Sequence, residues 1–189
     1  MKISSATFDH MKKMEAIRPI VYDDATGKDI ASYAAASGNP TIALGKKIEA
    51  HEKPTFASYL KGKAKLEGAA LKKVLEDTFR PREDKLTGLI KVPVTQSMFD
   101  AVFSFAFNTG FGAKSFKSVL EKLNARDYAG AKKAIADGPK TSKGKVMKGL
   151  EARRKYEAEL FAAEGLSPKG KAPLAGFQPS TGHFKRSGF

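Results

Sequence analysis

The chain has 189 residues and a mass of 20.4 kDa, enough for one domain or two small lobes and too little for a large multidomain protein. It contains no cysteine and only three histidines without metal-ligand spacing, which excludes disulfides and argues against a metal site. Thirty-four Lys and Arg against twenty Asp and Glu give a net charge of +14. Such a charge favours a polyanionic partner: nucleic acid, an acidic lipid surface or a bacterial cell wall.

Targeting segments are not apparent in the sequence. Residues 1–20 are interrupted by charges and lack the apolar region and small-residue cleavage site of a signal peptide. No run of about 18 apolar residues occurs that would span a membrane. We therefore expect the chain to start in a cytoplasm.

The first half of the sequence predicts a helix, a small sheet and a second helix. Apolar residues recur at every third position and predict a helix over residues 5–17. Short β-compatible pieces then alternate with the turn sequences DDATGKD and SGNP over residues 20–48, which predicts hairpins. The amphipathic pattern of residues 59–79 predicts a long helix that stops before Pro81, because proline disrupts a helix interior.

The second half predicts only helices. Thr95 is placed to cap an apolar helix, and Asp127 a shorter one. Between them, residues 116–123 carry apolar side chains at i, i+3, i+4 and i+7, which indicates another helix. Residues 144–161 predict a last helix, in which Val146 is expected to make apolar contacts.

These elements predict an α+β fold with two lobes and a cleft between them. We expect an N-terminal lobe with a small sheet over residues 1–60, a connecting helix and turn over 61–85, and a helical lobe over 86–163. Residues 164–189 are rich in Gly, Pro, Ser and Lys without any period, which predicts an irregular basic extension.

Two carboxylates stand at the ends of neighbouring predicted elements. Glu15 closes the first helix, and Asp24 opens the turn after the first strand. Glycoside hydrolysis requires such a pair, in which one acid protonates the leaving oxygen and a second carboxylate directs water or attacks the anomeric carbon. Most carboxylates are solvated surface charges, so the spacing alone does not decide between the two interpretations.

The sequence around both carboxylates is more specific. The run E-A-I-R-P-I-V-Y-D-D-A-T-G begins at Glu15, and T-I-A-L-G-K begins at Thr41. They resemble the signatures E-G-x-x-x-x-x-Y-x-D-x-x-G and T-I-G-x-G-H of the phage-type lysozymes, glycoside hydrolase family 24. The residues in register are Glu15, Tyr22, Asp24, Gly27, Thr41 and Gly45. Residues 28–40 are longer than the family's usual link, which predicts a hairpin extension.

The helical half resembles the same family. VPVTQSMFDAVFSFAFNTG is similar to its V-x-L-x-Q-x-Q-x-D-A-L-V-S-F-x-F-N-x-G, LEKLNARDYAGA to its L-x-x-L-N-x-G-D-Y-x-x-A, and GLEARRKYEAELF to its closing G-L-x-x-R-R-x-x-E-x-x-L. The resemblance thus extends from about Phe8 to Phe161. Arg153 and Arg154 in the last motif either bind wall phosphate or pair with Glu151 or Glu157, and the helical spacing favours the ion pairs.

The resemblance implies a peptidoglycan hydrolase that cleaves between N-acetylmuramic acid and N-acetylglucosamine. Glu15 would be the general acid, kept protonated by apolar neighbours such as Ile17, while Asp24, kept ionised, and Thr41 would position the attacking water. Thr26 is a rival for the last role because it lies close to Asp24 in the sequence, but only Thr41 begins the TIALGK motif.

The remaining implications concern ligands and surroundings. Tyr22 and Asn108 would bind substrate, although a C-cap role suits Asn108 equally well. The family resemblance implies no metal and no cofactor, a monomer, peptidoglycan as the partner, and no nucleic acid. The enzyme would wait in the host cytoplasm for a holin lesion, or be carried in with a virion.

Several positions depart from the family pattern. Ala16 and Ala43 replace glycines, Lys46 replaces a histidine, and the chain has no tryptophan. Ala43 is expected to deny the backbone the positive φ that glycine allows.

Three alternatives stay open at the level of sequence. The charge fits a nucleic-acid-binding protein, although no recognition helix, RNP-like motif or zinc spacing is present. The departures fit a wall-binding or virion protein of lysozyme fold without turnover. A lytic transglycosylase would need only the acid.

Overall fold

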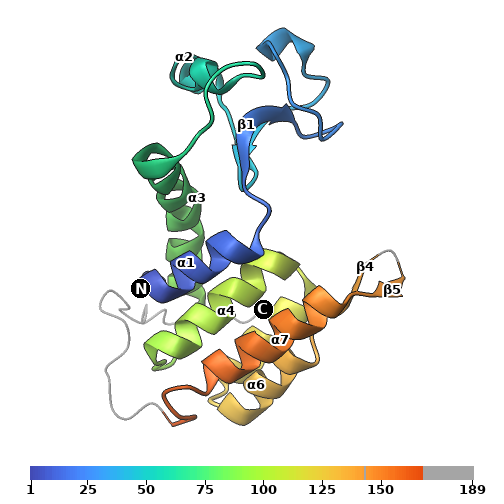
Figure 1. Cartoon of the computed structure of the whole chain (residues 1–189). Coiled ribbons are helices and arrows are strands. Elements are labelled where there is room, and N and C mark those ends of the chain that lie inside the picture. Colours follow the sequence, from blue (N-terminus) through green and yellow to red (C-terminus); the bar gives the residue numbers. More distant parts are fainter. Residues whose placement is uncertain (143, 168–189) are drawn as a thin grey trace, which may run out of the picture. The chain divides into compact units, whose positions relative to one another are not determined.

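The computed structural model describes residues 1–142 and 144–167, which fall into two compact units (Figure 1). One unit is Lys2–Lys85, and the other comprises Met1 and the chain from Leu86 onward. Most of the predicted extension, residues 168–189, lies outside the described residues. None of the helices in the described ranges combines the length and the hydropathy that a membrane-spanning segment needs.

The first unit contains a three-stranded antiparallel sheet in the order β1-β2-β3, which confirms the predicted small sheet. Its elements are α1 (Ser5–Met14), β1 (Arg18–Asp23), β2 (Pro40–Ala43), β3 (Lys46–Lys47), α2 (Lys53–Phe56), the 3₁₀ turns Tyr33–Ala35, Ala50–Glu52 and Ala57–Tyr59, and most of α3 (Gly68–Leu89). The last residues of α3, from Leu86, are assigned to the second unit. The residue pair Tyr22 and Thr41 lies directly opposite across β1 and β2. This register places the TIALGK motif beside the first carboxylate motif.

Helix α1 is shorter than predicted. The Ser4 hydroxyl caps it by accepting a hydrogen bond from the Thr7 backbone N–H at 3.2 Å. It ends at Met14 instead of Ile17, because Glu15 already has extended backbone angles and β1 begins at Arg18. The sheet therefore takes the residues that helical periodicity assigned to the last helical turn.

The core of this unit joins the sheet to the following helices. Buried side chains from β1 and β2, such as Val21 and Ile42, pack with Phe56 of α2 and Leu75 of α3. Ile30, from the segment between β1 and β2, belongs to the same core. The segment is therefore an integral part of the unit.

Helix α3 continues through Pro81, so the prediction that it stops there is wrong. Proline removes a backbone donor and crowds the preceding turn, at a cost of about 3 kcal/mol. Two side chains donate hydrogen bonds to backbone carbonyls of α3 near the proline. The Thr78 hydroxyl donates to the Val74 O at 2.7 Å, and the Arg82 guanidinium donates to the Thr78 O at 2.5 Å. Leu75, before the proline, and Leu86, after it, are both fully buried, and this burial offsets the cost.

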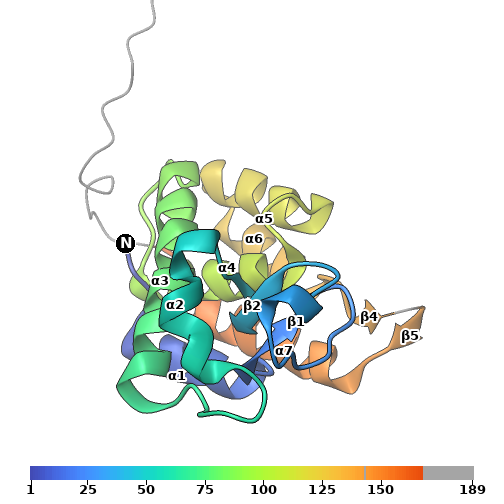
Figure 2. The same ribbon diagram turned by 90° about the horizontal axis from the view of Figure 1, so that it is seen from above.

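The second unit is a group of packed helices. They are α4 (Gln96–Thr109), α5 (Lys114–Asn124), α6 (Tyr128–Ala136) and α7 (Lys148–Phe161), with the short strands β4 (Thr141–Ser142) and β5 (Lys145–Val146) before α7. Both predicted caps are confirmed: the Thr95 hydroxyl accepts from Met98 N at 3.2 Å, and the Asp127 carboxylate from Gly130 N at 2.8 Å. Figure 2 shows α5 and α6 side by side, and α4 packs against α7.

The last helix begins later than predicted. Residues Thr141–Val146 include a hairpin, so α7 starts at Lys148 and not near residue 144. Val146 lies in that hairpin and its exposed fraction is 64%, so the prediction that it makes apolar contacts in the last helix is wrong. Gly144, with φ of +76°, supports the tight turn that interrupts the helical pattern.

Candidate active site

Glu15 occupies the position where the chain leaves α1. Its backbone N–H still donates to Met11 O at 2.9 Å, and its carbonyl accepts from Ile17 N at 2.9 Å, so the chain turns sharply toward β1. The Glu15 side chain is partly exposed. This places a carboxyl group just before the strand that carries the other candidates.

Two consecutive aspartates at the end of β1 have different surroundings. Asp23 is 1% exposed, and its carboxylate accepts hydrogen bonds from the N–H groups of Ala25, Ser37 and Gly38 and from the Thr26 hydroxyl, at 2.9 to 3.2 Å. Asp24 is more exposed. Its Oδ1 accepts from the Asn39 backbone N–H at 2.7 Å and its Oδ2 from the Asn39 side-chain amide at 2.9 Å.

Both aspartates are stabilised in the ionised form. The two hydrogen bonds from Asn39, followed by the Lys47 ammonium 3.7 Å from Oδ2, hold the pKa of the Asp24 carboxyl below its ordinary value. Burial would by itself raise the pKa of Asp23, but its four donors outweigh burial and lower it. An ionised Asp24 is what a water-directing base requires.

Thr41 shares a partner with Asp24. Its hydroxyl donates to the Asn39 carbonyl at 3.0 Å, and the Asp24 backbone N–H donates to the same oxygen at 3.1 Å. The rival Thr26 instead donates to Asp23 Oδ2 at 2.9 Å and accepts from the Lys28 N–H. The geometry therefore associates Thr41 with Asp24, and Thr26 with the structural turn.

Tyr22 lies on the strand beside these groups. The Cζ atom of Arg18 lies 4.1 Å from the centroid of the Tyr22 ring. Because Tyr22 lies directly opposite Thr41 in the sheet, the side chains of Tyr22 and Thr41 are on the same face. Burial raises the pKa of the Tyr22 hydroxyl, Arg18 lowers it, and the nearby Asp24 charge raises it again. Tyr22, Asp24 and Thr41 are thus gathered by the pairing of β1 with β2.

The structure shows the local geometry of two glycines that match the family motifs and of two departures, Ala43 and Lys46. Gly27 and Gly45 have φ of +68° and +79°, which glycine adopts without strain. Ala43 has φ of +55° although it is alanine, so the expectation that it denies the backbone a positive φ is wrong. Lys46 pairs with Glu52 at 2.8 Å.

The helical motifs meet in a buried polar network of the second unit. Arg153 and Arg154 lie 3.1 and 2.8 Å from the Glu157 carboxylate, which also accepts from the Ser104 hydroxyl at 2.7 Å. This confirms that both arginines pair with Glu157. Asn108 lies inside the last turn of α4, where its Oδ1 accepts from Arg154 at 2.9 Å, and the helix cap is Gly110.

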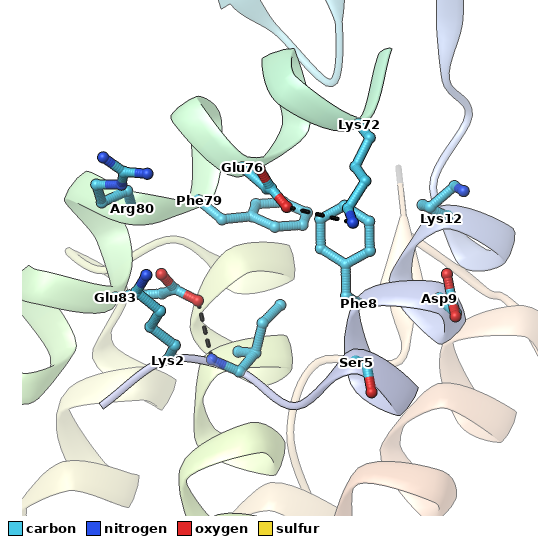
Figure 3. A pocket seen from close by; sticks show the side chains of 11 residues that line it. Lys2, Ser5, Phe8, Asp9, Lys12, Lys72, Glu76, Phe79, Arg80 and Glu83 are labelled. Carbon is cyan, nitrogen blue, oxygen red and sulfur yellow. Dashed lines mark hydrogen bonds and ion pairs between the residues drawn. The ribbon is translucent and has the colours of Figure 1, made fainter. Parts of the chain in front are cut away.

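A cavity of about 460 Å³ lies between the N-terminal segment, α1 and α3 (Figure 3). The rings of Phe8 and Phe79 line this cavity and pack edge to face, with their centroids 5.6 Å apart. Two of its three carboxylates have a partner: Glu83 accepts from the Ile3 N–H at 2.9 Å, and Glu76 lies 3.9 Å from the Lys72 ammonium. Neither Glu15, Asp24 nor Thr41 lines it, so it is separate from the candidate site.

The sequence pointed to Glu15, Asp24 and Thr41, but neither to Asn39, which contacts Asp24 and Thr41, nor to the buried Asp23. Asp23 and Asn39 are central to the hydrogen bonding around the sheet. The only sequence signals were the adjacent aspartates and the turn-like SGNP, and neither shows that residue 39 returns to residue 24.

Comparison with known proteins identifies the family. The sequence model of the phage lysozyme family matches residues 12–157. The chain belongs to the phage lysozyme family. The endolysin of Salmonella phage P22 is 29% identical over 163 residues, which cover 85% of this chain and 98% of that protein. A crystal structure of a P22 lysozyme mutant aligns with this family member at a TM-score of 0.62 and 26% identity, over 85% of this chain and 98% of that one, which confirms the predicted α+β lysozyme-like fold.

The Bacillus phage relatives are longer than this chain. The endolysin of Bacillus phage B103 is 42% identical over 89 residues, 47% of this phage lysozyme family member and 34% of that endolysin. The chain therefore spans about a third of the length of the Bacillus phage endolysins that it matches.

Proposed function

We propose that this member of the phage lysozyme family is a peptidoglycan hydrolase, a muramidase that cleaves the β-1,4 bond between N-acetylmuramic acid and N-acetylglucosamine. The observation that carries the proposal is the family match over residues 12–157, which contains Glu15, Asp24 and Thr41 in the family's order. The proposed reaction uses no metal and no cofactor.

Glu15 is the proposed general acid. It donates its proton to the glycosidic oxygen while the bond from that oxygen to the muramic anomeric carbon breaks. The N-acetylglucosamine then leaves with a free hydroxyl. The position of Glu15, at a helix end and partly exposed, supports this role because the carboxyl can meet a polymeric substrate.

Asp24 and Thr41 are proposed to position the attacking water. An ionised Asp24 accepts one hydrogen of the water and finally its proton, while the Thr41 oxygen accepts the other hydrogen. The water oxygen then bonds to the anomeric carbon. The hydrogen bonds from Asn39, which keep the pKa of Asp24 low, support this assignment.

Substrate contacts are assigned to Tyr22 and Asn108. Tyr22 lies beside Asp24 and Thr41 on the sheet, and Asn108 is held by Arg154. The net charge of +14 supports a wall substrate, since a cation is attracted to an anionic envelope and loses that attraction at high salt. We further propose that the protein acts as a monomer without nucleic acid and reaches the wall through a holin lesion or with a virion.

The test is mass spectrometry of soluble fragments released from purified peptidoglycan by the wild-type chain, Glu15→Gln and Asp24→Asn. Glu121→Gln, at an exposed position of α5, is the matched control. Reducing muramic ends from wild type and control, lost in both site variants, are expected. Anhydro ends would mean a transglycosylase, and no fragments from wild type would contradict enzymatic function.

A further inference from the structure

The segment between β1 and β2, residues 28–40, is folded onto the first unit. The Ile30 side chain is buried in the core, and its backbone N–H donates to Val21 O at 3.0 Å. Its carbonyl accepts from Lys61 N at 2.8 Å, and the Tyr33 hydroxyl donates to Lys53 O at 2.8 Å. Contacts at several points along the segment fix its path back to β2.

The end of this segment meets the candidate site through one residue. Asn39 donates to both oxygens of the Asp24 carboxylate, at 2.7 and 2.9 Å. The Asn39 carbonyl accepts from the Asp24 N–H at 3.1 Å and from the Thr41 hydroxyl at 3.0 Å. Asn39 thus contacts both residues proposed to hold the water.

The neighbours of Asn39 restrict its position. Pro40 begins β2 and favours an extended conformation at the residue before it. On the other side, Ser37 and Gly38 donate their N–H groups to Asp23 at 3.2 and 2.9 Å. A side chain at Gly38 would collide with Asp24 Oδ1, so glycine allows this close approach. The aspartate pair and residues 37–39 therefore form one interlocked structure.

From these contacts we infer that Asn39 is a positioning residue, which orients the Asp24 carboxylate and the Thr41 hydroxyl toward the attacking water. The inference rests on the proposed function. Asn39 occupies two of the roughly four acceptor positions of the carboxylate, and the others remain for water and for the Lys47 ammonium, which lies 3.7 Å from Oδ2. Because Thr41 donates its only hydrogen to Asn39, its oxygen can act toward any other partner only as an acceptor.

Loss of this orientation predicts a kinetic effect. Misplacing a reacting group by a small distance can lower a rate by roughly 100-fold. Asn39→Ala should therefore reduce kcat by about 10- to 100-fold with little change in KM. The acid limb of the pH profile should move to higher pH, since Asp24 loses the side-chain amide of Asn39, one of the two Asn39 donors that lower its pKa, and keeps the backbone N–H. Asn39→Ser, which keeps a donor, should recover part of the rate.

The control is Asn124→Ala. Asn124 also makes two hydrogen bonds, from its Nδ2 to Leu89 O at 2.9 Å and from Lys91 N to its Oδ1 at 2.8 Å, but it joins only backbone groups of the helical unit. Its loss should lower the Tm and leave the acid limb in place. Thermal unfolding of every variant separates a loss of folding from a loss of positioning.

The decisive readout is independent of activity. NMR titration of ¹³C-labelled aspartate in wild type, Asn39→Ala and Asn39→Ser follows the Asp24 carboxyl directly. A higher pKa for Asp24 in Asn39→Ala, partly reversed in Asn39→Ser and matched by the shift of the acid limb, is the expected result. An unchanged Asp24 titration, or an unchanged kcat and acid limb, would overturn the inference. An inactive wild type with the titration shift present would instead count against the proposed function.

Discussion

Asn39 holds Asp24 by two hydrogen bonds, from its backbone N–H to Oδ1 at 2.7 Å and from its side-chain amide to Oδ2 at 2.9 Å. The neighbouring Asp23 is held by four donors and is almost completely buried. Two adjacent carboxylates of the same chemistry therefore have different tasks. The inner one stabilises the turn, and the outer one is available for the proposed chemistry.

Substitution of Glu15 by Gln should abolish hydrolysis without unfolding the protein. Gln keeps the shape of the side chain but has no proton to donate to the leaving oxygen, so the rate should fall by at least about 100-fold. The free energy of unfolding should stay within about 0.5 kcal/mol of wild type, because the side chain is partly exposed. Fragment release and urea unfolding measure both, with Glu121→Gln as the control. Retained activity would refute the assignment of the acid.

Asp23→Asn and Asp24→Asn should separate stability from activity. Asp24→Asn should lower the rate by about 100- to 10,000-fold with a small change in Tm. Asp23→Asn should lower the Tm more, because the new amide cannot accept from all four donors. Equal Tm values for the two variants would contradict this division of roles.

The pH dependence of stability should carry the signature of Asp23. Its pKa is lowered in the folded protein, whereas the unfolded value is about 3.9. The ionised side chain therefore stabilises the fold above about pH 4, and this contribution is lost as the pH falls through the folded pKa. Thermal melts between pH 7 and pH 2 should show a smaller acid-induced fall in Tm for Asp23→Asn than for wild type. Parallel curves would count against a lowered pKa at this residue.

Glu157→Gln should strongly destabilise the helical unit. It leaves Arg153 and Arg154 buried without a counter-charge, and loss of one partner of a buried ion pair costs about 3–5 kcal/mol. The matched control is Glu159→Gln, two positions along α7, where the exposed carboxylate lies 4.0 Å from Lys155. That change should cost no more than about 1 kcal/mol. Urea denaturation compares the two, and similar costs would show that the buried network contributes little.

Replacement of Pro81 by alanine should stabilise the protein. Alanine restores a backbone donor within α3 and removes the crowding by the ring, which is worth about 3 kcal/mol. The more flexible unfolded chain offsets up to about 1 kcal/mol of this gain. We expect a net gain of about 2–3 kcal/mol in urea unfolding, whereas Arg80→Ala should change stability by about 0.5 kcal/mol or less. A loss of stability would mean that the proline fits this helix without strain.

Ala43 offers a test of backbone strain. Its positive φ costs roughly 1–2 kcal/mol, which Ala43→Gly should relieve. The same change removes a buried methyl group, which lowers stability by about 0.8 kcal/mol. It also raises the conformational entropy of the unfolded chain, which further lowers stability by about 0.4–1 kcal/mol. The free energy of unfolding of Ala43→Gly should therefore lie within about 1 kcal/mol of the wild-type value. Ala43→Val, with its β-branched side chain, should be less stable than wild type by at least about 2 kcal/mol. Tolerance of valine in thermal melts would contradict the positive φ.

Features that depend on a few neighbouring residues were predicted correctly from the sequence. Thr95 and Asp127 cap their helices, because a cap needs only a side-chain oxygen and an N–H two or three residues later. Ion pairing of Arg153 and Arg154 within the last helix, with Glu151 or Glu157, was also predicted, since helical spacing brings such side chains together, and the structure shows that the partner is Glu157. The family motifs identified the lysozyme-like fold.

The tertiary structure decided the features in which long-range contacts outweigh local preference. Burial of Leu75 and Leu86 carries α3 through Pro81 against the local cost of the proline. Pairing of β1 with β2 and the folding of residues 28–40 bring Asn39 to Asp24, fifteen positions away. The sequence by itself determined which carboxylates were candidates, but only the closure of that segment decided how Asp24 is held, because a hydrogen bond between distant residues depends on the path of all the residues between them.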